Sequence, residues 1–317
     1  MKIIRNMKKP VTLSYVMVLA TLVMGSIFGL VNADSSITPI RIQSDGSVSP
    51  ADVPIQRDGD VYRLTGNIYS PIVVDRDNIV IDGAGYTIQG TYNGTRTDDW
   101  VVGQGPNQNT SAIPWTIGID VATKFRYNMT VKNVNLKNFY IGMYVWTSNN
   151  TITGCSVTDN IVGILLSGDS NNITSNYVSH NEEGVFFGVN NPGNLPLDIL
   201  LTNNSFVDNI IQFSGCFCET YNTTEPIHTW DDGTRGNYWS DYNGTDTNGD
   251  GIGDTSYVID PLNLDRYPLV ENLIILPTPA PTQHPLDIIV PIAIVAALAL
   301  VTILVLAQKR RSKLRNT

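Results

Sequence analysis

Cysteine is scarce in this chain of 317 residues, which contains only Cys155, Cys216 and Cys218. Whichever way they pair, an odd number leaves at least one thiol free, and Cys216 and Cys218 are too close in sequence for an easy mutual bridge. The sequence therefore excludes a disulfide framework as the basis of the fold.

Basic residues are scarce in the middle of the chain. Nine of the 20 Lys and Arg lie in the first nine and the last nine residues, whereas all 29 Asp and Glu lie between Asp34 and Asp287. The segment between these limits has eleven basic residues and a net charge of −18. Such an excess disfavours nucleic acid and anionic lipid as partners, and favours divalent cations or neutral glycans.

Both ends of the chain carry apolar runs. Basic residues precede the first run, and small residues follow it, which predicts a signal peptide over residues 1–33, with an uncleaved anchor as the alternative. Residues 288–307 lack charge and, at about 1.5 Å per residue, are long enough for a transmembrane helix. Because the tail 308–317 is basic, we expect the C-terminus in the cytoplasm and the body outside.

An internal repeat occupies the middle of the chain. Apolar positions within short alternating stretches recur at offsets of 21 residues and, in the last copy, 28. One series is Val131, Ile152, Ile173 and Leu201; a second is Leu136, Val157, Val178 and Phe206; a third is Met143, Ile164 and Val185; a polar series is Asn160, Asn181 and Asn209. Alternation indicates strands, and no segment between residues 34 and 285 has a helical period.

Short strands at this period predict an all-β fold, a right-handed parallel β-helix (solenoid) with coils stacked at about 4.8 Å. Leucine-rich repeats have similar periods, but their leucine pattern is missing. We expect aliphatic ladders inside, asparagine ladders at the corners, and an outward Ser156 by alternation. Glycines at matching places should break the strands: Gly142, Gly163 and Gly184. An earlier coil at residues 78–88 matches the one that begins at Asn128.

The composition of the segments after the repeat indicates their roles. Residues 220–272 are aromatic and acidic and are expected to cap the last coil, while the proline spacing of residues 273–287 predicts a semi-rigid stalk. The predicted organisation is therefore a signal peptide 1–33, a β-helix 34–219, a C-terminal cap 220–272, a stalk 273–287, one transmembrane α-helix 288–307 and a basic tail 308–317.

The cap contains a segment with the spacing of a Ca²⁺ loop. Its oxygen side chains fall at loop positions 1, 3, 5 and 9, Gly251 takes the turn at position 6, and a carbonyl is available at position 7. Position 12 is Tyr257 rather than Glu, so a bidentate ligand must come from elsewhere, with Asp260 as a candidate, or be missing. We expect a structural Ca²⁺, with a metal-free turn as the alternative. The candidate ligands are Asp246, Asn248, Asp250, Ile252 and Asp254.

Two further sets of residues are candidates for contact with glycans. Four aromatic residues could stack on sugar rings or, as the favoured alternative, cap the apolar end of the coils: Trp230, Tyr238, Trp239 and Tyr242. Eight sequons are candidates for N-glycosylation: Asn93, Asn109, Asn128, Asn149, Asn172, Asn203, Asn222 and Asn243.

From about Ile40 to Val270 the chain resembles the periplasmic NosD-like family of right-handed parallel β-helix proteins, in the form common among archaeal surface proteins. The resemblance is carried by residues 54–59, 78–90, 236–242, 246–254 and 267–269. It implies the fold strongly and the activity weakly. Members named for maturation of nitrous-oxide reductase are linked to copper delivery, and the wider superfamily includes carbohydrate-binding proteins and sugar hydrolases.

Copper delivery requires imidazole or soft ligands. The body offers His180, His228, His284, Met129 and Met143. These residues are scattered along the repeat and the stalk, so they predict no copper cluster. A Cys-Phe-Cys run at residues 216–218 could bind a soft metal with His228, although two small residues near the last coil are the favoured interpretation.

Polysaccharide cleavage requires paired carboxylates, or Ca²⁺ with a basic residue. Asp159, Glu182 and Asp208 should lie near one another along the repeat, with Glu183 beside them. Between Lys137 and Arg235 there is no Lys or Arg for a lyase, and solvated coil faces explain the acids equally well.

We therefore expect a surface protein at the cell membrane, anchored by a single C-terminal span with its N-terminal body outside. Its expected role is non-catalytic binding of glycans or contact with cell-envelope proteins, and nucleic acid is not an expected partner. The first alternative is a polysaccharide lyase or hydrolase, and the second is a NosD-like copper delivery factor.

Overall fold

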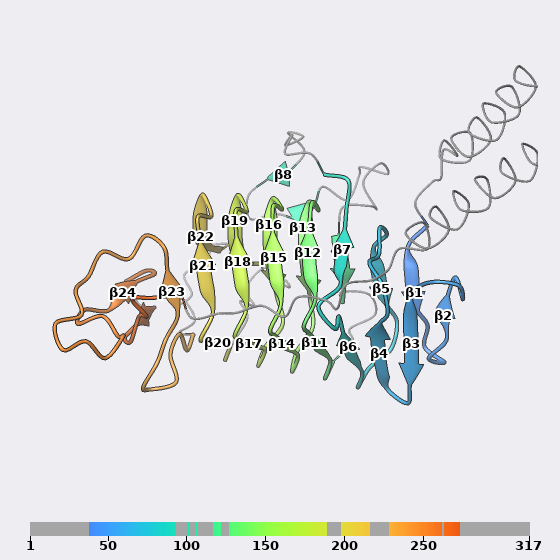
Figure 1. The fold of residues 1–317 in the computed structure, drawn as a ribbon, viewed down its shortest axis with the longest axis horizontal. Coiled ribbons are helices and arrows are strands. Elements are labelled where there is room, and N and C mark those ends of the chain that lie inside the picture. The colour runs from blue at the N-terminus through green and yellow to red at the C-terminus, as the bar shows by residue number, and fades with distance from the viewer. Residues whose placement is uncertain are drawn as a thin grey trace, which may run out of the picture. The chain divides into compact units, whose positions relative to one another are not determined.

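A computed structural model describes residues 38–92, 100–101, 105–106, 117–121, 127–188, 198–215, 228–261 and 263–272. In the compact unit that begins at Pro39, strands stack into three sheets that are parallel except for two antiparallel pairs at one end. From Ile117 to Gly215, successive strands along the chain belong to successive sheets (Figure 1). This is the arrangement of a parallel β-helix, as predicted. The segments predicted as signal peptide, stalk, transmembrane helix and tail lie outside these residues, and the described part contains no helix able to cross a membrane.

Three sheets run along the stack. Sheet A contains, in spatial order, β2 (Val48–Ser49), β1 (Ile40–Ile42), β5 (Ile72–Val74), β10 (Ile117–Asp120), β13 (Ile141–Val145), β16 (Val162–Leu166), β19 (Glu183–Phe187) and β22 (Ile211–Gly215). Sheet B contains β20 (Leu200–Thr202), β17 (Asn172–Thr174), β14 (Thr151–Thr153), β11 (Thr130–Lys132), β6 (Val80–Asp82), β4 (Val61–Leu64) and β3 (Ile55–Asp58). Sheet C contains β23 (Tyr238–Trp239), β21 (Ser205–Val207), β18 (Tyr177–Ser179), β15 (Ser156–Thr158), β12 (Asn135–Lys137) and β7 (Thr87–Gln89).

Two short antiparallel pairs lie outside these sheets. β8 (Trp100–Val101) pairs with β9 (Gly105–Pro106) inside the long excursion between the first coils. β24 (Tyr257–Val258) pairs with β25 (Leu264–Asp265) in the predicted cap. The cap is joined to the stack because β23 pairs with β21 in parallel.

The predicted apolar ladders are confirmed. Val131, Ile152, Ile173 and Leu201 pair in successive coils of sheet B. The series through Val157 does the same in sheet C, and the series through Ile164 in sheet A. Each of these side chains is at most 2% exposed, so like residues stack on like residues to fill the interior. The earlier coil also matches, since Ile81 pairs with Val131.

The asparagine ladder at one corner is confirmed as well. The Asn181 Oδ1 atom accepts hydrogen bonds from the backbone N–H (2.9 Å) and the side-chain amide (3.0 Å) of Asn160. Asn209 receives the same pair of bonds from Asn181, at 3.0 and 2.9 Å. A buried backbone turn needs such partners because water cannot reach it. A second ladder that sequence analysis missed runs through Asn176, Asn204 and Asn237.

One local prediction is wrong, and one outward residue is less exposed than expected. Gly142, Gly163 and Gly184 do not break the strands: they lie within β13, β16 and β19. They stack so closely that a Cβ on Gly142 would lie 2.7 Å from the carbonyl oxygen of Gly163, which explains the need for glycine. Ser156 alternates with the interior Val157 and so faces outward, as predicted, but it is buried, between Asn135 and Tyr177 of the neighbouring coils.

Cys155 is a free cysteine inside the stack, and burial raises the pKa of its thiol to about 12. Its Sγ atom lies 3.5 Å from the backbone oxygen of Thr153. It therefore acts as a small core residue rather than as a nucleophile. Cys216 and Cys218 lie outside the described residues.

Candidate functional site

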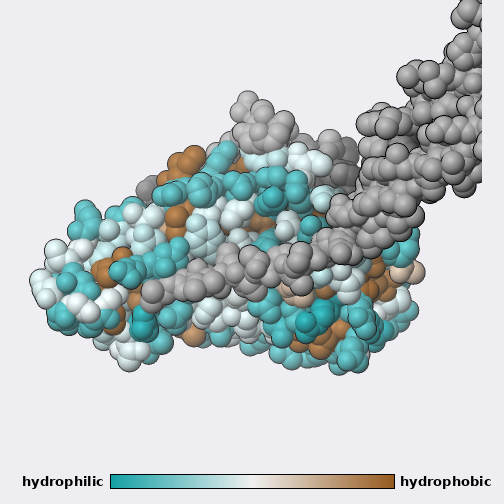
Figure 2. Space-filling view, viewed as in Figure 1, coloured by the Kyte–Doolittle hydropathy of each residue, from teal (hydrophilic) through white to brown (hydrophobic). Residues whose placement is uncertain are grey.

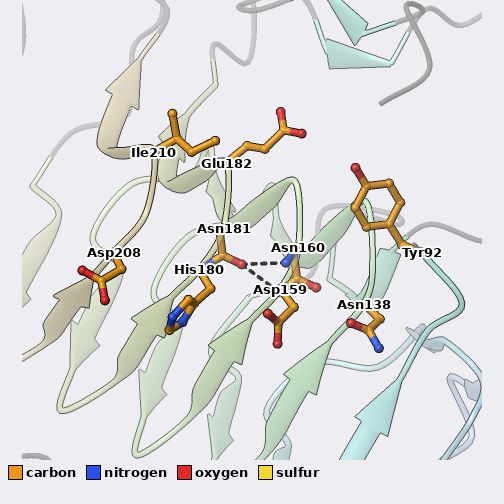
Figure 3. Close-up of a pocket in the computed structure, with 9 residues that line it drawn as sticks. All are labelled: Tyr92, Asn138, Asp159, Asn160, His180, Asn181, Glu182, Asp208 and Ile210. Atoms are coloured by element: carbon orange, nitrogen blue, oxygen red, sulfur yellow. Dashed lines mark hydrogen bonds between the residues drawn. The ribbon is translucent and has the colours of Figure 1, made fainter. Parts of the chain in front are cut away.

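A groove of about 670 Å³ crosses several coils at the corner between sheets C and A. It is lined by Tyr92, Asn138, Asp159, Asn160, His180, Asn181, Glu182, Asp208 and Ile210 (Figure 3). The three carboxylates that the repeat places near one another thus share one groove, whereas Glu183 is buried beside it and its Oε2 atom accepts a 2.5 Å hydrogen bond from Ser214.

One wall of the groove is a column with one residue from each coil. Asn138, Asp159, His180 and Asp208 have positive φ angles of 61°, 57°, 55° and 51°. Asn and Asp tolerate this left-handed conformation better than most residues, which fits the composition of the column. The buried amides of Asn160 and Asn181 lie between this wall and a second one formed by Ile210, Glu182 and Tyr92 (Figure 3).

Sequence analysis missed part of this lining. The sequence suggests His180 only as a candidate copper ligand. Yet it follows Asp159 by 21 residues and precedes Asp208 by 28, and these are the offsets of the ladders. Those offsets could have identified the column. Tyr92 carries no such signal, because it precedes the long excursion.

The described surface is mainly hydrophilic on the face seen in Figure 2. Among the described residues, a few large apolar side chains are exposed, and Ile210, at 80% exposure, is the most exposed of them. It lies on the rim of the groove. An isoleucine so accessible at a groove offers apolar contact to a ligand.

The aromatic residues of the cap fill the end of the core. Trp230 and Trp239 are each 1% exposed. Trp239 stacks between Phe206 and Tyr257, with ring centroids 4.5 and 4.3 Å away. Both faces of this indole are thus covered, so the capping alternative accounts for the two tryptophans and neither is available to stack on a sugar.

The other two members of the aromatic set, Tyr238 and Tyr242, are only partly buried. Tyr242 donates a 2.7 Å hydrogen bond from its hydroxyl to the backbone oxygen of Thr255. This contact joins the turn after β23 to the residue that follows the Ca²⁺-loop-like segment. Stacking on a sugar by these two tyrosines stays a prediction.

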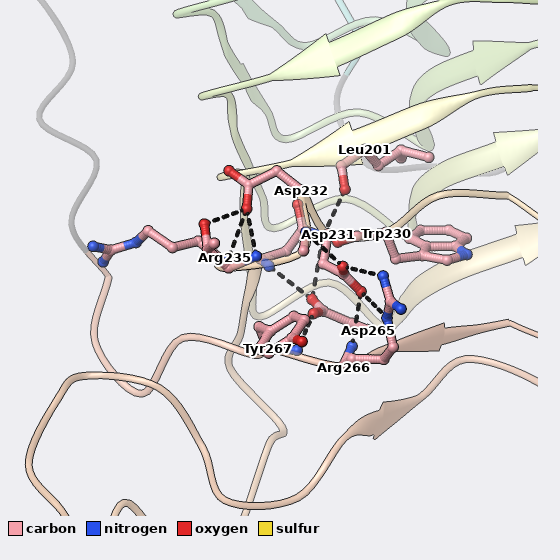
Figure 4. A network of polar contacts seen from close by, with 11 residues as sticks. Leu201, Trp230, Asp231, Asp232, Arg235, Asp265, Arg266 and Tyr267 are labelled. Atoms are coloured by element: carbon pink, nitrogen blue, oxygen red, sulfur yellow. Dashed lines mark hydrogen bonds and ion pairs between the residues drawn. The ribbon is translucent and has the colours of Figure 1, made fainter.

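Two buried aspartates join separate segments of the cap (Figure 4). Asp231 accepts hydrogen bonds from the guanidinium of Arg266 at 2.6 and 2.9 Å, which, with other hydrogen bonds, lower the pKa of its carboxyl despite burial. Asp265 accepts hydrogen bonds from the backbone (2.7 Å) and side-chain amide (3.2 Å) of Asn237 and from the Trp239 indole (2.9 Å). Burial raises the pKa of Asp265 to about 6.

The Ca²⁺-loop-like segment has the expected glycine turns, with φ angles of 74° at Gly249 and 86° at Gly251. Asp246 accepts bonds from the backbone N–H groups of Gly249 and Gly251, at 2.8 and 2.9 Å. Asp250 is bonded to the Asn248 amide at 2.9 Å. Hydrogen bonds from two threonines, Thr245 and Thr247, lower the pKa of Asp254. The carboxylates thus bind neighbouring groups of the loop, and, as elsewhere in the described ranges, no three of them form a group that could hold a metal ion, so the Ca²⁺ site stays a prediction.

The described sequons lie at coil corners, on strands or in the cap. Asn128, Asn149 and Asn243 are exposed, and Asn172 and Asn203 are partly buried. Asn93, Asn109 and Asn222 lie outside the described residues. The exposed positions have the accessibility that glycosylation requires.

The candidate copper ligands are dispersed. Met129 and Met143 are core residues, 1% and 0% exposed. His228 packs edge-on against Phe187, with ring centroids 4.5 Å apart, and burial lowers its pKa to about 4. His180 is exposed at a coil corner. Across the described ranges, no three His, Cys, Asp or Glu form a group that could hold a metal ion, so these residues do not fit copper. His284 and the Cys-Phe-Cys run lie outside those ranges.

Comparison with known proteins yields a family for the chain. Residues 73–244, which contain most of the stack and the whole groove, match the family described as periplasmic copper-binding protein (NosD). That description agrees with a body that faces outside the cytoplasm. No curated protein matches the chain. Because the family match spans more than half of the sequence, the protein belongs to the NosD family of periplasmic β-helix proteins.

Proposed function

We propose that this protein is a non-catalytic, glycan-binding β-helix of the cell envelope. The groove at the corner between sheets C and A carries this proposal, because it combines hydroxyl-binding side chains with apolar ones along several coils. Carboxylates and amides accept and donate hydrogen bonds to sugar hydroxyls, while Tyr92 and Ile210 offer surface to the apolar faces of the rings.

The site would be held outside the cell by the predicted terminal segments. Residues 1–33 would direct export, residues 288–307 would span the membrane, and the proline-rich stalk would keep the body above the surface. We expect the coil to be right-handed, because crossovers between parallel strands almost always are. Cell-envelope proteins are a second class of partner for the same surface.

Ca²⁺ would hold the cap rather than take part in a reaction. Asp246, Asn248, Asp250 and Asp254, with the carbonyl of Ile252, would supply the oxygen ligands. The loop follows Trp239 and Tyr242, which close the core. Binding there would fix a segment with few apolar anchors.

A glycan array tests the proposal. The full chain, purified in detergent, is applied with and without Ca²⁺, and bound glycans are compared with those bound by Ile210→Glu, which places a charge on the groove rim. We expect a restricted set of linear glycans to bind the native chain and to be lost in the variant. Binding of no glycan at all would contradict the proposal, and release of shortened sugars would favour the hydrolase alternative.

A further inference from the structure

The column Asn138, Asp159, His180 and Asp208 repeats once per coil along the groove. Neighbouring coils of a parallel stack are about 4.8 Å apart, which is close to the advance of one sugar along an extended glycan chain. In Figure 3 the four side chains stand in a row and project in a common direction. A linear chain that lies along the stack axis would therefore meet an equivalent position at each sugar.

The charges of the groove restrict what this chain can be. Three of its lining residues are carboxylates, none is Lys or Arg, and the sequence has no Lys or Arg from Asn138 to Thr234. A glycan with uronate or sulfate groups would face like charge without a cation to pair with. A glycan with protonated amino groups would form charge-assisted hydrogen bonds, which are about twice as strong as neutral ones.

His180 separates the two carboxylates of the column. Its Nδ1 atom lies 3.1 Å from the Ser179 hydroxyl, so the ring is fixed against its own coil. Asp159 and Asp208 are consequently two rungs apart on the same wall, with Tyr92 and Ile210 across the groove. This arrangement presents separate anionic positions to one extended ligand, rather than one compact site for a metal ion.

We propose that the groove selects linear amino-sugar chains whose amino groups are free, and that Asp159 and Asp208 confer the selectivity. The inference rests on the proposed glycan-binding function and names the substrate class of the same site. Amino groups would meet the two carboxylates, while the apolar ring faces would meet the opposite wall.

Binding of three oligosaccharides of equal length to the full chain in detergent tests this inference. The probes are oligomers of glucosamine, of N-acetylglucosamine and of galacturonate, measured by calorimetry at low salt. We expect the glucosamine oligomer to bind at least about tenfold more tightly than its acetylated form, which corresponds to one charge-assisted contact. The galacturonate oligomer should bind least.

Variants test whether the preference for the free amine comes from the two carboxylates of the column. Asp159→Asn with Asp208→Asn keeps the shape of the column and should remove the preference for the free amine. The matched control is Asp58→Asn, an exposed carboxylate on β3, far along the stack from the groove. It should leave the preference unchanged. Circular dichroism checks that each variant is folded.

Each remaining outcome would overturn the inference in a recognisable way. Equal binding of the free and acetylated oligomers would remove the role of charge but leave glycan binding intact. Absence of binding by all three probes, together with an empty glycan array, would remove the proposed function itself. Equal affinity for an oligolysine of the same charge, or equal losses in the control variant, would show general attraction to an acidic surface.

Discussion

The two halves of the body, residues 34–137 and residues 138–272 with the cap, share apolar ladders but differ in the polar contacts between coils. Residues 34–137 contain nine Lys and Arg and eleven Asp and Glu, whereas residues 138–272 contain two and seventeen. In the first half, Arg63 and Lys132 approach buried Asp82 from the coils on either side, at 2.9 and 3.8 Å. In the second half, asparagine amides make the corresponding contacts.

This difference has a physical consequence for the surface. Ion pairs between coils need basic residues as well as carboxylates, and the first half, with nine basic and eleven acidic residues, is nearly neutral. Amide ladders need no charge, because each amide both donates and accepts. The second half can therefore carry a large acidic excess at its corners without weakening the contacts between coils, and every groove-lining residue except Tyr92 lies in that half.

The largest effect is expected from a charge in an apolar ladder. Val157→Asp would bury a carboxylate among Leu136 and Val178, which offer no partner. A buried unpaired charge costs several kcal/mol, so we expect loss of the cooperative unfolding transition. Thr158→Asp, at the next and partly exposed position, is the matched control and should fold. Equal damage from both changes would show that the interior has been assigned to the wrong residues.

Breaking the amide ladder should have the next largest effect. Asn181→Ala would leave the backbone N–H and side-chain amide of Asn160 without their partner and would remove one hydrogen bond to the carbonyl of Val157. At about 1–3 kcal/mol for each buried unpaired group, we expect a loss of about 4 kcal/mol in the free energy of unfolding by urea. Thr153→Ala on sheet B should change it little. A loss below about 1 kcal/mol would contradict the role of the ladder.

Asp265 and His228, two buried groups of the second half, should have opposite effects on the pH dependence of the free energy of unfolding. The pKa of Asp265 rises from 3.8 to about 6 on folding, so this residue makes the fold more stable as pH falls from about 6 to 4. The pKa of His228 falls from 6.5 to about 4, so this residue makes the fold less stable over almost the same interval. Each effect is about 3 kcal/mol, and they nearly cancel in the native chain.

Variants separate the two effects. In Asp265→Asn, unfolding free energy should decrease on acidification from pH 6.5 to 4, while in His228→Phe it should increase. Urea titrations at several pH values measure both slopes. Asp231 and Asp254, whose pKa values are lowered, add their own dependence only below about pH 4. Parallel slopes in the two variants would show that these groups do not act as described.

Removal of Ca²⁺ should lower the stability of the second half alone, because the predicted loop lies in the cap. A ligand present at 100 times its Kd stabilises the folded state by about 2.7 kcal/mol, so a chelator should lower the melting temperature. Asp250→Ala should abolish that difference and leave the far-UV circular dichroism at low temperature unchanged. Identical melting curves with Ca²⁺ and with chelator would identify the loop as a plain turn.

The smallest effect is expected in the first half. Arg63→Ala removes one partner of Asp82, but Lys132 and the Asn133 amide at 3.2 Å remain, and the Arg63 side chain is 57% exposed. We expect a loss of about 1 kcal/mol in urea unfolding. A loss as large as that of Asn181→Ala would remove the distinction between the two halves.

The ladders could be predicted because a constant offset of 21 residues places like residues in neighbouring coils. The offset does not state whether a glycine ends a strand or lies within it, or how closely its neighbours cover an outward side chain, so the place of the glycines and the burial of Ser156 could not be predicted from it. The role of Asp265 at the end of the second ladder could not be predicted either. It accepts the two hydrogen bonds of Asn237 that the next asparagine would accept, but it is a different residue type at a different offset. Tyr92 joins the groove from a coil that the long excursion separates from the others.

The hydrogen bonds between stacked asparagines do not depend on the number of residues that separate the two asparagines in the sequence. Asn160 and Asn181 are 21 residues apart and Asn181 and Asn209 are 28 apart, yet the bonds have the same lengths within 0.1 Å. Extra residues can therefore enter one coil without disturbing its neighbours. Two kinds of change in the sequence would therefore have different effects. An insertion within one coil would alter the surface of that coil alone, whereas a whole added coil would lengthen the groove by one sugar position.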